Sequence, residues 1–147
     1  MAYKKIVCGV TASAHSQKAA LEAARLAKEN GAELVYVYVV DLSFLKGGKS
    51  GSLSSDVVGQ SIEKLGRQIV DLAEQIAASV GVKPVKIVRK GSVLEVLGQV
   101  ITEQKADLLV LGHEERTFFE KHLFKGDVED HLSELKAKTG AEVTIVK

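Results

Sequence analysis

Ala106-Asp107-Leu108-Leu109-Val110-Leu111-Gly112 is the stretch of this sequence that decides the fold. Its four consecutive aliphatic residues predict a strand that is buried on both faces, which is typical of a parallel sheet covered by helices. A glycine that leads from such a strand toward a helix often begins a loop that holds phosphate on backbone N–H groups. The stretch therefore predicts an α/β fold with a candidate anion site after Gly112.

Strand and helix signals alternate along the rest of the chain. Ser13 or Ser16 can cap a first helix that Gly31 ends, and Ser92 with Glu95 forms a capping box for a later one. Val128, Leu132 and Leu135 mark a last helix that Gly140 ends. Apolar, β-compatible runs predict strands over residues 5–10, 33–40, 84–88, 108–111 and 142–146.

The glycine- and serine-rich segment 43–55 is interpreted as a mobile loop, and a long helix is expected over residues 56–80. Apolar residues three or four apart predict its buried stripe. They are Val58, Ile62, Leu65, Ile69, Leu72, Ile76 and Val80.

This alternation of strands and helices predicts an open five-stranded parallel sheet with helices on both faces. Right-handed crossovers lead to a flavodoxin-like or Rossmann-like arrangement, for which we expect the strand order 3-2-1-4-5. Ligands of such sheets bind at the carboxyl ends of the strands, where the strand order reverses. The loops after Val10, Val40 and Gly112 are therefore the expected site.

Length and composition favour a single domain over residues 1–147. The net charge of +1 gives no general attraction to nucleic acid or to an anionic membrane, and no apolar run is long enough to span a bilayer. The single cysteine, Cys8, excludes an intramolecular disulfide and favours a cytoplasmic location.

Residues 4–19, KKIVCGVTASAHSQKA, resemble the opening of the universal stress protein family. Gly91 fits the glycine before that family's third helix, and residues 106–112 resemble the strand that leads to its phosphate loop. The resemblance implies a cleft for ATP or AMP and a homodimer that pairs through the C-terminal strand. The residues of the opening that match are Ser13, His15, Ser16, Lys18 and Ala19.

The chain departs from the family's nucleotide motif, which is glycine, two residues, glycine, nine residues, then glycine with serine or threonine. Glu115 replaces the middle glycine, ten residues follow it instead of nine, and Asp127 replaces the hydroxyl residue. Thr11 stands where the family has an aspartate that contacts adenine. The candidate nucleotide-contacting residues are Thr11, Val40, Gly112, Arg116, Gly126, Asp127 and Val128.

These departures weaken the case for nucleotide binding. Asp127 is well suited to cap a helix, where its carboxylate occupies N–H groups that a phosphate needs. Two like charges about 4 Å apart repel by roughly 1 kcal/mol in water and by several times more at a protein surface. We therefore favour a non-catalytic binding or regulatory module with a degenerate cleft. The alternative is a working ATP or AMP binder with slow or no hydrolysis.

Other site chemistries have less support. His113, Glu114, His122, Asp127 and His131 match no standard metal-ligand spacing, and His15 is interpreted as a structural surface residue. The hydroxyl-rich first loop could hold a flavin phosphate, but the chain has no tryptophan and few aromatics to stack on the ring. No serine has a histidine and acid at a spacing that indicates a nucleophilic triad.

Overall fold

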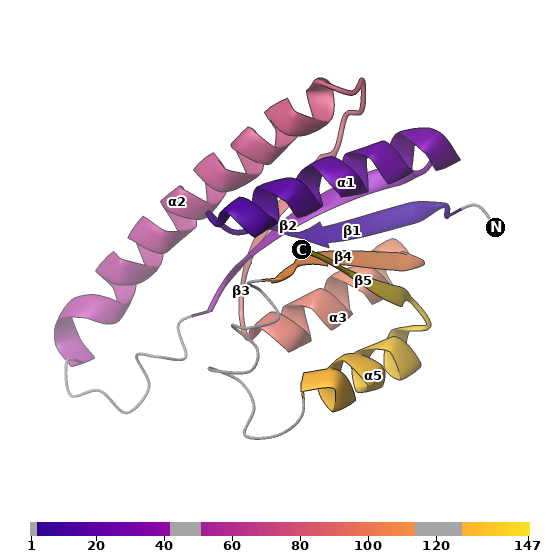
Figure 1. The fold of residues 1–147 in the computed structure, drawn as a ribbon. Helices are drawn as coiled ribbons and strands as arrows, with labels where there is room; N and C mark the ends of the chain where they lie inside the picture. Colours follow the sequence, from indigo (N-terminus) through magenta and orange to yellow (C-terminus); the bar gives the residue numbers. More distant parts are fainter. Residues whose placement is uncertain (1–2, 42–50, 114–127) are drawn as a thin grey trace.

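Five parallel strands form one sheet in the computed structural model, which describes residues 3–41, 51–113 and 128–147 (Figure 1). The strand order is β3-β2-β1-β4-β5, so the predicted fold class and strand order are confirmed. The strands are β1 (Lys5–Gly9), β2 (Glu33–Val40), β3 (Val85–Lys90), β4 (Leu108–Gly112) and β5 (Glu142–Val146). The helices are α1 (Ala14–Asn30), α2 (Gly51–Ala78), α3 (Val93–Gln104) and α5 (Val128–Thr139).

Helices cover both faces of the sheet, as expected for strands that are apolar on both sides (Figure 1). α1 and α2 lie on one face, where alternate strand residues form one core; it includes Ile6, Cys8, Leu34, Tyr36, Leu108 and Val110. α3 and α5 cover the other face, where the intervening residues form a second core; it includes Val7, Val35, Val37, Leu109 and Leu111.

The predicted helix ends are confirmed at the positions where side chains or glycine satisfy backbone groups. Ser13 caps α1 and accepts a hydrogen bond from the Ser16 N–H, and Ser92 caps α3 by accepting from the Glu95 N–H. Gly31 closes α1 with φ +63°, in the left-handed region that favours glycine.

α2 is longer than the sequence suggests, because it begins at Gly51 rather than near residue 56. The loop prediction for residues 51–55 is therefore wrong, whereas residues 43–50 lie outside the described residues. Glycine and serine each cost at most about 1 kcal/mol in a helix interior relative to alanine. Adding a turn to a helix that tertiary packing already anchors is easier than nucleating one.

The buried stripe predicted for α2 is also partly wrong. Leu65 and Leu72 are 45% and 56% exposed, whereas the helix turns its smaller residues to the sheet. A Cβ added to Gly66 would lie 2.4 Å from the Tyr38 ring, so the missing side chain lets α2 approach β2 closely. The buried residues of this face include Gly66, Ile69, Val70, Ala73 and Ala77.

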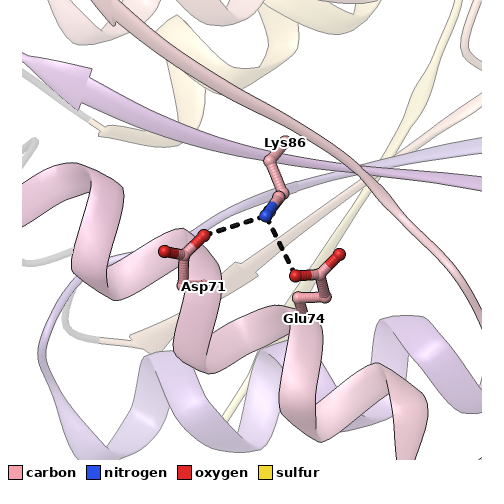
Figure 2. A network of polar contacts seen from close by, with 3 residues as sticks. All are labelled: Asp71, Glu74 and Lys86. Atoms are coloured by element: carbon pink, nitrogen blue, oxygen red, sulfur yellow. Dashed lines mark hydrogen bonds and ion pairs between the residues drawn. The ribbon is translucent and has the colours of Figure 1, made fainter.

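The two edge strands, β3 and β5, differ in whether they carry charged side chains that discourage pairing with another chain. On β3, Lys86 donates to Asp71 and Glu74 of α2, at 2.9 Å each (Figure 2). Arg89 of the same strand makes a bidentate ion pair with Glu103 of α3. Lysine and arginine on an edge strand discourage pairing with another chain. β5 carries neither within its five residues, so it is the edge better suited to a partner strand.

Candidate functional site

The strand order reverses between β1 and β4, and this locates the expected ligand crevice. From β1 the chain moves outward to β2 and β3, and then crosses to β4 on the opposite side of β1. The loops that follow β1 and β4 therefore leave the sheet in opposite directions from neighbouring strands. Such a point forms the ligand crevice in open α/β sheets.

The loop after β1 is held by a circuit of hydrogen bonds among its own hydroxyl groups. The Thr11 N–H donates to Ser16 Oγ at 2.7 Å, and the Ser16 N–H donates to Ser13 Oγ at 3.0 Å. Thr11 Oγ1 donates to Ser13 Oγ and accepts from the Ser13 N–H, each at 3.2 Å. Ser16 is only 1% exposed, so its buried hydroxyl holds the loop in place through the hydrogen bond from Thr11.

This circuit limits what the first loop can offer a ligand. Ser13 already accepts from one of the N–H groups at the start of α1, and Thr11 directs its hydroxyl to Ser13. A phosphate that used these groups would have to replace existing hydrogen bonds, which removes much of the net gain. Thr11 also supplies a neutral hydroxyl, which accepts hydrogen bonds less strongly than a carboxylate does.

Val40 lies at the carboxyl end of β2 with its side chain in the core, only 1% exposed. Its carbonyl accepts from the Gly91 N–H at 3.1 Å. Gly91 has φ +147°, and a Cβ there would lie 2.7 Å from Val96 Cγ2. The loop after β3 is therefore fastened to the end of β2 in a form that requires glycine.

Of the other candidate nucleotide-contacting residues, the structure describes two. Gly112 is the last residue of β4, is buried, and pairs with Val146 of β5. Val128 is the first residue of α5. Arg116, Gly126 and Asp127, like Glu115, lie outside the described residues. The structure thus brings Thr11, Val40 and Gly112 to one edge of the sheet, as predicted.

The structure also shows a pair of histidines that sequence reasoning did not connect. His15, in the first turn of α1, and His113, just after β4, have ring centroids 5.8 Å apart and an interplanar angle of 69°. Both side chains are half-buried, so His15 is only partly exposed at the surface. The available signal was that both follow strands that should be neighbours at the switch point.

The described part of the chain lacks two features that would point to other functions. Over residues 3–41, 51–113 and 128–147, no three His, Cys, Asp or Glu side chains gather closely enough to hold a metal ion together. In the same part of the chain, no helix has both the length and the apolar character needed to cross a bilayer.

Comparison with known proteins agrees with this architecture. Residues 2–146 match the model of the universal stress protein family. The chain is 31% identical over 121 residues to the universal stress protein MJ0531 of Methanocaldococcus jannaschii, covering 82% of this chain and 71% of that protein.

Solved structures show the same fold at lower sequence identity. A universal stress protein in complex with cAMP has a TM-score of 0.68 and 21% identity, over 100% of this chain and 98% of the other. The universal stress protein of Archaeoglobus fulgidus in complex with dAMP has a TM-score of 0.62 and 18% identity, over the whole of both chains. With the family match over nearly the full sequence, these results show that the chain belongs to the universal stress protein family.

Proposed function

We propose that the protein is a non-catalytic binding or regulatory module whose cleft, at the carboxyl ends of β1, β2 and β4, binds adenine nucleotides only weakly. The observation that carries this proposal is the hydroxyl circuit of the first loop. Thr11, Ser13 and Ser16 already satisfy one another there, and Thr11 replaces a carboxylate. Two structural neighbours were solved with cAMP and dAMP, so adenosine monophosphates are the ligand class to test first.

The proposal extends to the whole chain as one domain of residues 1–147. In its support, the single sheet takes strands from both ends of the sequence, β1 and β5. A cytoplasmic location, which the single cysteine favours, stays a prediction. The alternative is a working ATP or AMP binder with slow or no hydrolysis, which would keep its nucleotide through purification.

We expect ATP to bind with a dissociation constant above about 100 μM, because a triphosphate meets the acidic substitutions of the motif and a loop that is already hydrogen-bonded. Titration calorimetry with ATP, AMP and cAMP, in the presence of a chelator, measures this directly. Low-micromolar binding of ATP, or nucleotide released from the purified protein on denaturation, would favour the alternative. Glu115→Gly combined with Asp127→Ser should tighten binding if the acidic substitutions limit it.

We also propose that two copies pair through β5 to form a homodimer. In support, β5 is an edge strand, its last four side chains are partly buried, and it lacks the lysine and arginine that β3 carries. The Glu142 N–H donates to the Asp107 carbonyl beside β4. Because N–H groups alternate in direction along a strand, those of Thr144 and Val146 also point to β4, whereas those of Val143 and Ile145 point outward.

Ile145→Pro should therefore weaken the dimer about tenfold or more, because the two-fold axis removes an outward donor from each copy. Sedimentation of the wild type at about 50 μM should show a dimer, as expected for a stable strand-paired interface. Ile145→Ala is the matched control, since it shortens the same side chain but keeps the N–H. Thr144→Pro should instead disturb the β4–β5 pairing and lower stability. A monomeric wild type would contradict the assembly, and a dimer unaffected by Ile145→Pro would locate the interface elsewhere.

A further inference from the structure

We propose that His15 and His113 form a binding site for a divalent transition-metal ion of the Zn²⁺ type, at the crevice between the loops that follow β1 and β4. The site is separate from the proposed nucleotide function, because both ligands that we assign to it are imidazole rings. Their proximity is a product of the fold: His15 begins α1 and His113 follows β4, almost one hundred residues later in the sequence.

The spacing of the two rings fits a shared ion. With metal–nitrogen bonds of about 2.0–2.1 Å, two imidazoles on one tetrahedral ion have ring centroids roughly 5–6 Å apart. The centroids of His15 and His113 are 5.8 Å apart. Imidazole is also the ligand that Zn²⁺, Ni²⁺ and Cu²⁺ share, whereas Mg²⁺ and Ca²⁺ prefer oxygen.

The orientation of the two rings bears on how they could share an ion. At 69° they meet edge to face, and a turn of one ring about its Cβ–Cγ bond can direct a nitrogen of each ring at a shared ion. That torsion is broad in histidine, and turning it costs little. Nδ1 is buried in both residues, so we assign Nε2 of each ring as the ligating atom.

Two protein ligands leave the ion with open coordination positions. Because no third His, Cys, Asp or Glu completes a cluster within the described residues, water or an anionic oxygen of a ligand would fill them. Open positions distinguish reactive and ligand-binding metal sites from closed structural ones. The positive end of the α1 dipole makes the binding free energy of a cation less favourable by about 0.3–1 kcal/mol. We therefore expect affinity on the order of 10 μM, weaker than a closed site of three or four ligands.

Titration calorimetry of the full chain with Zn²⁺ and with Ni²⁺, without nucleotide, tests the site. We expect one ion to bind per chain. Either His15→Asn or His113→Asn should lower the affinity by at least roughly 10–100-fold, because removing even an outer-shell partner of a metal ligand causes a loss of that size. His131→Asn is the matched control and should leave the affinity unchanged. Mg²⁺ should show no comparable binding. Unchanged affinity in both variants of the pair, or equal loss in His131→Asn, would overturn the assignment.

An NMR measurement on the wild type tests the site without any substitution, so it holds even where a variant fails to fold. Sub-stoichiometric Cu²⁺ should broaden the NMR ring signals of His15 and His113 before those of the other two histidines. Broadening of His122 and His131 first would overturn the proposal. The outcome is independent of the nucleotide titrations, which are performed with chelator, so either proposal can fail while the other stands.

Discussion

Replacing Tyr36 by alanine should lower the free energy of unfolding by about 3–5 kcal/mol, the range typical of large aromatic truncations in a core. Tyr36 lies in β2 with 0% exposure, among the residues that α1 and α2 cover. Its hydroxyl donates to the Ala20 carbonyl of α1 at 2.7 Å. The variant loses the packing of the ring and the link between sheet and helix. Urea unfolding at fixed protein concentration measures the change.

Tyr36→Phe separates the hydroxyl from the ring and should cost only about 0.5–1.5 kcal/mol. Burial raises the pKa of Tyr36 above its ordinary value of 10.0. Because the unfolded chain then releases this proton more readily than the folded one, the residue stabilises the fold below about pH 10 and loses that contribution as the pH rises further. The stability of Tyr36→Phe should therefore fall less steeply above pH 10. If Tyr36→Ala cost no more than Tyr36→Phe, the ring would not be packed as described.

Gly91→Ala should lower the free energy of unfolding by about 2–4 kcal/mol, since two costs act together. The backbone at φ +147° is one that L side chains rarely adopt, and the new Cβ would lie 2.7 Å from Val96 Cγ2. Val96 cannot turn away easily, because a β-branched side chain in a helix has one strongly preferred rotamer. Thermal and urea unfolding should both report the loss.

Gly140→Ala is a control that replaces a positive-φ glycine without creating a steric contact. Gly140 has φ +76° with nothing within 4 Å of an added Cβ, so its replacement should cost about 1–2 kcal/mol. Combining Gly91→Ala with Val96→Ala should recover the contact part of the loss, which a double-mutant cycle measures as coupling between the two positions. A Gly91→Ala variant as stable as the wild type would mean that the loop after β3 adopts another conformation.

The sequence by itself was enough to predict the parallel sheet and its strand order. Strand-forming residues that are apolar on both sides indicate a helix-covered parallel sheet, and the handedness of the crossovers leaves few arrangements of such strands. Ser13, Ser92 and Gly31 marked helix ends through local chemistry that acts within a few residues. The locations of Thr11, Val40 and Gly112 at one edge follow from the same topology.

Only the tertiary structure decided which side of α2 faces the sheet and which side chains meet beyond the carboxyl ends of β1 and β4. The periodicity of apolar residues predicts that Leu65 and Leu72 lie in the core. In the structure, Gly66 packs against the Tyr38 ring, and both leucines are exposed. Close packing favours the orientation that brings backbone and ring together over the one that buries the largest residues. His15 and His113 become neighbours through the pairing of β1 with β4, a contact between distant segments that no local sequence pattern encodes.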